Sequence, residues 1–204
     1  MKRVVVTGMG VISPVGNSVK EFWTSLCGGK CGIDFITRFD TTDFKVKIAA
    51  EVKNFDPLAY GMDKSDVRRS DIYTQYALAA AYQAVCDSGI SETLECERFG
   101  VYVGSGIGGM TTFVQETEKL LSIGPKKVSP FFVPMMIGNI AAGSIAIKYH
   151  AEGPCLPVVT ACATSTHAIG EAYRAIKHGY ADAIIAGGAE ATITPLAIAG
   201  FTNF

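Results

Sequence analysis

Short apolar runs alternate along the chain with longer stretches in which apolar residues recur at helical spacing. The short runs lie at residues 4–7, 99–103, 157–160 and 183–186, and they predict buried strands. Between them, most apolar positions recur at the spacing of one helix face, which predicts helices. Strands that alternate with helices predict an α/β fold with a largely parallel or mixed sheet.

The ends of several helices carry clear signals. Ser18 and Glu21 form a capping-box pattern before a helix that the glycines after Cys27 end. Gly89 and Gly179 follow two further helical stretches, as glycines commonly follow the last turn of a helix. The two stretches that these glycines follow span residues 71–88 and 163–178, and two more helices are predicted at residues 110–121 and 134–149.

The last of these helices has an unusual composition. Small residues stand on nearly all of its faces, among them Ala163, Ser165, Ala168 and Gly170. A helix that is small or apolar all round is expected to be buried. We therefore expect residues 163–178 to lie inside the fold.

Composition narrows the class of protein. The 204 residues carry 18 basic and 19 acidic side chains, 49% of the residues are apolar, and mean hydropathy is +0.27. This balance excludes a disordered chain and a general binder of polyanions such as nucleic acid. The high apolar share predicts a large surface that is buried against a partner.

The chain ends on an apolar segment, residues 200–204, whereas a domain end is usually solvated. We therefore interpret it as a piece of a longer protein. No uninterrupted apolar stretch of about 18 residues predicts a membrane span, and no secretory signal is evident. The six cysteines show no CxxC pair and no metal-ligand spacing, which predicts free thiols, no metal site and a cytoplasmic location.

Cys162 is the strongest candidate for chemistry. It stands between the strand predicted at 157–160 and the helix predicted at 163–178. The free N–H groups and the dipole at a helix N-terminus stabilise a thiolate, and the same N–H groups suit an oxyanion at an attacked carbonyl. Position alone leaves a second interpretation open, in which Cys162 is a small core residue.

No histidine offers that thiol a local base. His167 lies about 140° around the helix from Cys162, and His178 lies roughly 24 Å along it. His150 reaches the thiol only through tertiary folding. We interpret all three histidines as structural.

Residues 104–109, Gly-Ser-Gly-Ile-Gly-Gly, satisfy the pattern G-x-G-x-x-G between a predicted strand and a predicted helix. This is the context of a dinucleotide fingerprint. The acidic residue expected about 20 positions later is missing, because Lys126 and Lys127 stand there instead. A glycine-rich turn that shapes a pocket is the favoured interpretation, with nucleotide binding left as an alternative.

Two small basic clusters stand out from the neutral total. Such clusters are commonly plain solvated surface, but on a neutral protein they suit an acidic protein partner better than DNA. Core packing is the default for the nearby apolar residues 131–136, which are also suited to line a tunnel for a fatty chain. The basic residues are Lys64, Arg68, Arg69, Lys126 and Lys127.

Six segments together resemble the β-ketoacyl-acyl-carrier-protein synthases, the condensing enzymes of fatty-acid synthesis. They include Gly-Ser-Gly-Ile-Gly-Gly, Ser-Pro-Phe-Phe-Val-Pro, Thr-Ala-Cys-Ala-Thr-Ser and Ala-Gly-Gly-Ala-Glu. Their joint occurrence is highly specific, and the first two are closer to the type II subclass than to type I. The segments span residues 5–10, 13–17, 104–109, 129–134, 160–165 and 186–190.

The resemblance implies a thiolase-like α/β fold, in which two related halves form a five-layered αβαβα structure that usually pairs as a homodimer. Family members are much longer than this chain. Residues 1–204 therefore resemble the N-terminal ketosynthase domain, apparently truncated, with the C-terminal half absent. We expect little condensing activity from these residues alone.

The resemblance also implies roles for individual residues. Cys162 takes the acyl group from a carrier-protein thioester, and its own N–H forms half of an oxyanion hole. Ile107, Phe132 and Phe201 fall where the family lines its acyl pocket. The five basic residues fall in or near the patches that dock acyl-carrier protein.

In the family reaction, malonyl-acyl-carrier protein loses CO₂ and its carbanion attacks the acyl-cysteine. Two histidines and a lysine of the C-terminal half assist, so His150, His167 and His178 are not assigned to these roles. The protein itself needs no cofactor, because phosphopantetheine arrives on the carrier protein. Three alternatives stay open: a polyketide ketosynthase or thiolase-like acyltransferase, a non-catalytic partner subunit, and a dinucleotide-dependent oxidoreductase.

Overall fold

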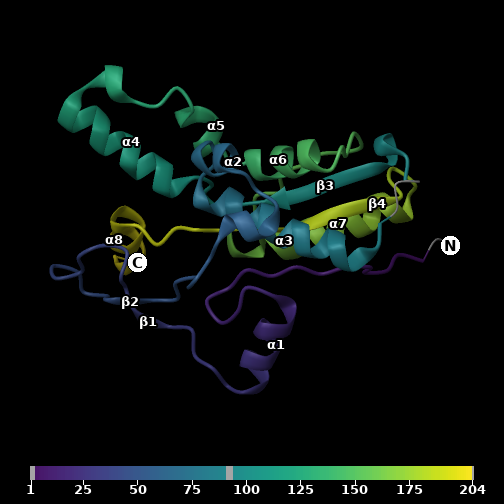
Figure 1. The fold of residues 1–204 in the computed structure, drawn as a ribbon, viewed down its shortest axis with the longest axis horizontal. Coiled ribbons are helices and arrows are strands. Elements are labelled where there is room, and N and C mark those ends of the chain that lie inside the picture. The colour runs from purple at the N-terminus through teal and green to yellow at the C-terminus, as the bar shows by residue number, and fades with distance from the viewer. Residues whose placement is uncertain (1–2, 91–93, 204) are drawn as a thin grey trace.

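The computed structural model describes residues 3–90 and 94–203. Two parallel strands form its centre, β3 (Phe99–Gly104) and β4 (Ala183–Gly188). Figure 1 shows helices on both sides of this pair, which is an α/β arrangement. The prediction of strands at residues 99–103 and 183–186 is confirmed.

The two faces of β3 pack against different helices. Val101 and Val103 belong to the larger core, with α3 (Ile72–Ser88) and α6 (Ile140–Lys148). Tyr102 belongs to a smaller core with α7 (Thr164–Lys177). This alternation follows from the twofold side-chain period of a strand.

Helix α3 is the central helix of the larger core. Asp71 caps its first turn by accepting a hydrogen bond from the N–H of Tyr73, and Gly89 ends it in the left-handed conformation, with φ of 59°. Tyr73 and Ala79 are completely buried. The helix predicted at 71–88 is therefore confirmed to within a residue.

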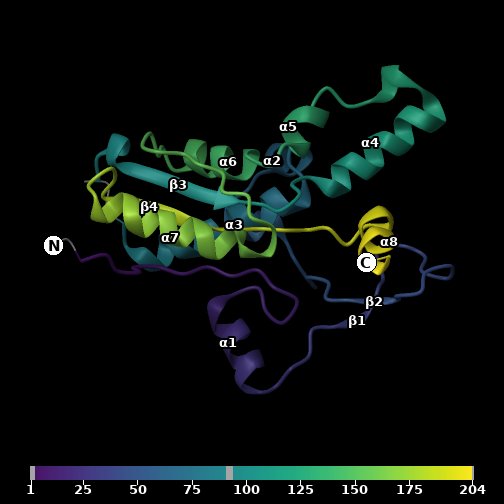
Figure 2. The same cartoon turned by 180° about the vertical axis from the view of Figure 1, so that it is seen from behind.

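The other elements surround this core (Figure 2). Ser18 caps the first helix, as the sequence predicted, by accepting from the N–H of Glu21. The helices are α1 (Val19–Cys27), α2 (Lys64–Arg68), α4 (Met110–Ile123), α5 (Phe132–Met136) and α8 (Pro195–Thr202). Strands β1 (Asp34–Phe35) and β2 (Ile48–Ala49) pair antiparallel, and the single turns are η1 (Pro57–Tyr60), η2 (Cys96–Arg98), η3 (Pro125–Lys127) and η4 (Ala161–Ala163).

The single helix predicted at residues 134–149 is wrong, because the structure divides it into α5 and α6. Ile137 is extended, with ψ of 133°. Its carbonyl accepts the hydroxyl of Tyr73 at 2.7 Å, and the carbonyl of Met136 accepts the N–H of Gly109 at 3.0 Å. Tertiary hydrogen bonds therefore replace two bonds of the expected helix.

The strand predicted at residues 4–7 is also absent. Val6 is 78% exposed, and the following residues lie along α3 instead of in a sheet. The N–H of Met9 donates to Asp87 at 3.0 Å and that of Val11 to Gln83 at 3.3 Å. Side chains of α3 thus take the place of a neighbouring strand.

The strand predicted at residues 157–160 is also wrong, because the chain pairs with β3 before that range and not within it. The chain joins β3 only just before that range, through a bridge at Cys155 and the N–H of Leu156, which donates to Val101. Within the described residues it makes no further backbone hydrogen bond to β3 after Leu156, although Val158 still lies beside Gly104 at the end of that strand. The described residues contain no helix long and apolar enough to cross a membrane.

Helix α7 is confirmed in position, but the prediction that it is buried is wrong. Ala168 and Ala172 face the sheet and are buried, whereas Ile169 is 52% exposed and Tyr173 is 46% exposed. No element within the described ranges covers this outer face. The small residues of α7 are thus packed on one side only.

Candidate active site

The turn that carries Cys162 joins an extended segment to helix α7. Cys162 is the middle residue of η4 and its side chain is exposed. Ala161, just before it, has a left-handed backbone with φ of 49°, which costs an L-residue roughly 1–2 kcal/mol. The N–H of Ala163 donates to the carbonyl of Thr160 at 3.0 Å. A strained, closed turn therefore presents the thiol at the amino end of α7.

One N–H group beside this thiol is open, that of Cys162 itself, whereas the N–H groups of Ala163 and Thr164 donate to the carbonyls of Thr160 and Ala161. Within the described part of the chain, the N–H of Cys162 has no hydrogen-bond acceptor, and no side chain caps α7. Open N–H groups at a helix N-terminus favour an anion. The arrangement can therefore stabilise a thiolate, and it can donate to an oxyanion formed on a carbonyl that the thiolate attacks.

The glycine-rich segment lies against this turn. A side chain at Gly104 would collide with the carbonyl of Val158, 1.8 Å from the position of a Cβ, and with Thr164 at 2.5 Å. A Cβ on Gly106 would lie 3.7 Å from the Cα of Ala161. Glycine is thus needed at position 104 because Val158 and Thr164 lie so close, whereas a Cβ at position 106 would make ordinary contact with Ala161 and would crowd the Glu190 carboxylate, at 2.8 Å.

The carboxylate of Glu190 occupies the N–H groups of this segment. It accepts from the N–H of Gly106 at 2.9 Å, from the N–H of Ile107 at 3.1 Å and from the hydroxyl of Ser105 at 3.2 Å. The Ser105 hydroxyl in turn accepts from the N–H of Gly108 at 2.9 Å. An internal carboxylate therefore sits where a dinucleotide-binding loop would hold phosphate.

Desolvation of its carboxylate raises the pKa of Glu190, and the hydrogen bonds from the loop oppose this rise only in part. Part of the residue is exposed, but the carboxylate itself lies against the loop. In the sequence, Glu190 stands out only as the last residue of the Ala-Gly-Gly-Ala-Glu motif. Its contact with residues 105–107, 83–85 positions away, has no signal in the local pattern.

The predicted pocket residues lie in three places. Ile107, 44% exposed, is on the glycine-rich segment. Phe132 begins α5, which the same segment contacts through Gly109 and Met136, and its ring centroid is 6.5 Å from that of Phe113. Phe201 is on α8, which Figures 1 and 2 show apart from the central strands. Their role in an acyl pocket stays a prediction.

The five basic residues belong to two elements. Lys64 and Arg68 lie in α2, and the guanidinium of Arg69 lies 5.2 Å from the centroid of the Phe131 ring. Lys126 and Lys127 are exposed in η3. Figure 1 shows that α4 extends away from the sheet and that the chain after it returns to α5, beside α2. Arg69 therefore approaches the start of α5, and the two lysines stand farther out.

The histidines have other neighbours. The Nδ1 atom of His178 lies 2.9 Å from the carbonyl oxygen of Arg174, and the Nε2 atom of His167 lies 3.8 Å from Glu171. His150 is exposed. No group of histidine, cysteine and acidic residues in the described ranges could hold a metal ion.

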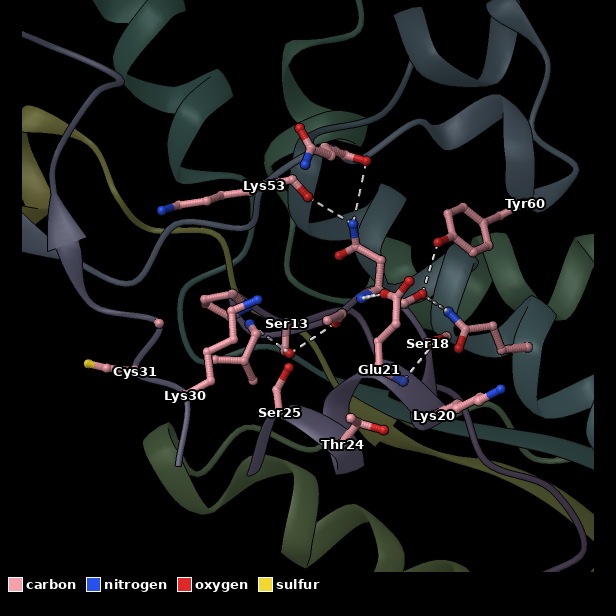
Figure 3. Close-up of a pocket in the computed structure, with 17 residues that line it drawn as sticks. Ser13, Ser18, Lys20, Glu21, Thr24, Ser25, Lys30, Cys31, Lys53 and Tyr60 are labelled. Atoms are coloured by element: carbon pink, nitrogen blue, oxygen red, sulfur yellow. Dashed lines mark hydrogen bonds between the residues drawn. The ribbon is translucent and has the colours of Figure 1, made fainter. Parts of the chain in front are cut away.

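A polar cavity of 980 Å³, which the sequence did not predict, lies away from Cys162 (Figure 3). Residues 13–18, part of α1 and Tyr60 line it, with Lys20, Lys30 and Lys53 at its edge. Asn17 donates to the carbonyl of Lys53 at 2.8 Å. A second cavity, of 370 Å³, lies beside α7 and Tyr102. Neither cavity is lined by Cys162.

Comparison with known proteins identifies the class to which this fold and turn belong. The family model described as "Beta-ketoacyl synthase, N-terminal domain" matches residues 1–204. The chain therefore belongs to the β-ketoacyl synthase family.

A curated relative narrows the likeness further. The chain is 50% identical over 202 residues to 3-oxoacyl-[acyl-carrier-protein] synthase 2 of Coxiella burnetii (strain RSA 493 / Nine Mile phase I), a match that covers 98% of this chain and 48% of the relative. This chain thus spans about half the length of the curated relatives it matches. The resemblance noted in the sequence is confirmed.

Solved structures agree with the fold. The ishigamide ketosynthase/chain length factor superposes with a TM-score of 0.88 at 32% identity, over 98% of this chain and 50% of that one. A type II polyketide acyl-carrier protein in complex with its ketosynthase, AntDE:AntF, gives a TM-score of 0.84 at 25% identity, over 98% of this chain and 54% of the other. The thiolase-like α/β fold is confirmed.

Proposed function

We propose that this chain provides the nucleophile of a β-ketoacyl-acyl-carrier-protein synthase of type II, acting in fatty-acid elongation. The observation that carries the proposal is the exposed Cys162, with its own N–H unpaired among the described residues, in the turn that leads into α7. Similarity to a named 3-oxoacyl-[acyl-carrier-protein] synthase 2 at 50% identity supports the choice of substrate class.

In the proposed reaction, the Cys162 thiolate attacks the carbonyl carbon of an acyl thioester on acyl-carrier protein. A carbon–sulfur bond forms, the phosphopantetheine thiolate leaves, and the acyl group remains on Cys162. Malonyl-acyl-carrier protein then loses CO₂, and its carbanion attacks the acyl-cysteine. A carbon–carbon bond forms, the Cys162 thiolate leaves, and the product is a β-ketoacyl thioester.

The N–H of Cys162 is proposed to donate to the oxyanion in both attacks. Ile107, Phe132 and Phe201 are proposed to line the acyl pocket. Phosphopantetheine belongs to the carrier protein, so no cofactor of the chain itself takes part. A homodimer in the cytoplasm is proposed with this activity, since six free thiols suit a reducing compartment.

The oxidoreductase alternative loses its main support. A dinucleotide needs the N–H groups of the glycine-rich turn for its pyrophosphate. In this chain Glu190 already accepts from Gly106 and Ile107. We expect no NADPH binding by fluorescence titration, and saturable binding would reinstate that alternative.

Labelling of the cysteines tests the nucleophile directly. All six cysteines are exposed residues, so exposure alone does not select Cys162. Partial desolvation of its sulfur raises the pKa of the Cys155 thiol. A thiol-directed inhibitor with a fatty chain should modify Cys162 first, as peptide mass spectrometry would record. A Cys162→Ala variant should take up label only slowly. Modification of Cys27 or Cys155 with Cys162 untouched would contradict the proposal.

Transfer of an acyl group tests the reaction. We would join this chain to the C-terminal half of the Coxiella burnetii relative, so that the hybrid has the length of a whole synthase. The hybrid should accept an acyl group from acyl-carrier protein and elongate it, whereas its Cys162→Ala variant should do neither. A hybrid in which Cys162→Ala elongates as fast as the parent would exclude Cys162 as the nucleophile.

Carrier docking has its own test. In the same hybrid, the double change Lys126→Glu and Lys127→Glu should raise the KM for acyl-carrier protein, and added salt should reduce the difference. The matched control is Lys30→Glu, because Lys30 is exposed at the polar cavity instead. If Lys30→Glu raised this KM as much as each change in η3 does, η3 would not be a docking patch.

A further inference from the structure

Glu190 stands out among the charged groups that the proposed reaction does not use. Its carboxylate accepts hydrogen bonds from two consecutive backbone N–H groups and one hydroxyl of the glycine-rich segment. Hydrogen bonds to an ionised group are stronger than those between neutral groups. The segment is therefore held by a side chain that lies two residues after the end of β4, the other strand of the central pair.

The held segment is the one that meets the nucleophile turn. Gly106 approaches Ala161, the left-handed residue before Cys162, and Ile107 is its next neighbour along the chain. On the far side, the N–H of Gly109 donates to Met136 at the end of α5. One short segment thus connects the thiol, Ile107 and the helix that carries Phe132.

A second carboxylate fixes the other end of this segment. Asp71, buried at the start of α3, accepts from both the N–H and the hydroxyl of Thr112, each at 2.7 Å. Thr112 lies in the first turn of α4. Between β3 and this anchor, Glu190 is the acceptor that the N–H groups of Gly106 and Ile107 have within the described residues, while Gly108 and Gly109 are held by Ser105 and Met136.

We propose that Glu190 is a positioning residue, which holds Gly106 and Ile107 against the Cys162 turn and thereby sets how long an acyl chain the site accepts. The inference rests on the proposed function, because it assigns Glu190 to the acyl site of Cys162. Glu190 itself touches neither the thiol nor the substrate. It acts through the place of the Ile107 side chain.

Two variants separate the hydrogen bonds from the charge. Glu190→Ala removes every acceptor. Glu190→Gln keeps one oxygen, which can still accept from Gly106 and Ile107. The matched control is Glu152→Ala, since Glu152 is an exposed glutamate at the opposite, amino end of β3, where its N–H donates to Cys96.

Amide hydrogen exchange tests the positioning. In the hybrid, the N–H groups of Gly106 and Ile107 should exchange about tenfold faster or more in Glu190→Ala, because each loses a charged acceptor. Glu190→Gln should restore most of the protection, and Glu152→Ala should leave it unchanged. Unchanged exchange in Glu190→Ala would overturn the inference, whatever the activity.

Acyl selectivity tests the role in the reaction. The ratio of kcat/KM for long against short acyl thioesters should change about tenfold in Glu190→Ala, and Glu190→Gln should recover the parent ratio. Faster exchange with an unchanged ratio would also overturn the inference, since Glu190 would then only stabilise the loop. A parent hybrid that never acylates Cys162 contradicts the proposed function instead, and the exchange result then still decides whether Glu190 holds the segment.

Discussion

Helices α3 and α7 differ both in composition and in surroundings, because α3 carries one charged residue, Asp87, whereas the shorter α7 carries three charged residues and His167. Both are rich in alanine and both contact the central strands. Helix α3 is packed by α6, η1 and the sheet, and nearly all of its first half is buried. Helix α7 packs on β3 and β4 through Ala168, Ala172 and Ala175, while Ile169 and Tyr173 face outward. The nearly uncharged α3 is typical of a helix inside a core, whereas the charged residues of α7 fit a helix with one face uncovered.

The amino ends of the two helices differ as well. At α3, Asp71 caps the first turn and also binds Thr112. At α7, no side chain caps the helix and Cys162 stands just before it. A satisfied helix end contributes to stability, whereas an open one is available to stabilise charge that develops during a reaction. The capped amino end therefore suits α3 to a structural role, and the uncapped one suits α7 to the site around Cys162.

The largest effect is expected where α3 meets α6. Ile145 is 1% exposed in the core between these helices, so Ile145→Ala should reduce the free energy of unfolding by about 2–5 kcal/mol. Ile147, two residues later in α6, is 78% exposed. Ile147→Ala should change that free energy by less than about 0.5 kcal/mol. Equal costs in urea unfolding would mean that α6 does not pack on α3 as described.

The cap of α3 should matter less than its core. Asp71→Ala removes the cap and leaves the buried N–H of Thr112 without its acceptor, so the free energy of unfolding should fall by about 2–3 kcal/mol. Ser18→Ala, which removes the exposed cap of α1, should cost about 1 kcal/mol. Thermal and urea unfolding of both variants would measure the difference. A smaller loss for Asp71→Ala than for Ser18→Ala would contradict the role assigned to Asp71.

The ends of α3 and the place of Cys162 could be predicted from the sequence, because the signals for them are local. Local signals were sufficient for the ends of α3, because Asp71 and Gly89 are neighbours of the helix they bound. The same holds for the place of Cys162 between an extended segment and α7. Propensity and capping act over a few residues, so they can be read directly from the chain.

Long-range contacts were not predictable in this way. The break at Ile137 depends on the hydroxyl of Tyr73, 64 residues away, and the contact of Glu190 with Gly106 joins positions 84 apart. The exposure of Val6 and of α7 depends on which elements lie beside them. A pattern states that a face is apolar, but it does not state which neighbour covers it.

Two glutamates should respond to acid in opposite directions. Hydrogen bonds from Lys119 and from the N–H of Ser129 lower the pKa of Glu116, so its stabilising contribution is present above the unfolded value near 4.5 and is lost as pH falls through the folded value. Desolvation raises the pKa of Glu190, so its ionisation opposes folding above the folded value, and this cost disappears as pH falls.

Unfolding measured between about pH 3 and pH 7 with the two Gln variants tests these signs. Glu116→Gln should lower stability near neutral pH and make stability less sensitive to acid. Glu190→Gln should leave stability at neutral pH equal or higher, and it should make the loss toward low pH steeper. If stability depended on pH with the same slope in both variants, at least one of the two pKa directions would be wrong.

The smallest effect is expected on the outer face of α7, and it decides how far the comparison with α3 holds. Ile169→Ala should change the free energy of unfolding of this chain by less than about 0.5 kcal/mol, because Ile169 is 52% exposed and deleting its outer atoms leaves no cavity. In the hybrid of full synthase length, a cost of about 1–3 kcal/mol would mean that added residues cover this face. Helix α7 would then be packed on both sides, as α3 is. An unchanged small cost in the hybrid would mean that the two helices differ in the longer protein as well, and that the apolar outer face of α7 stays in contact with solvent.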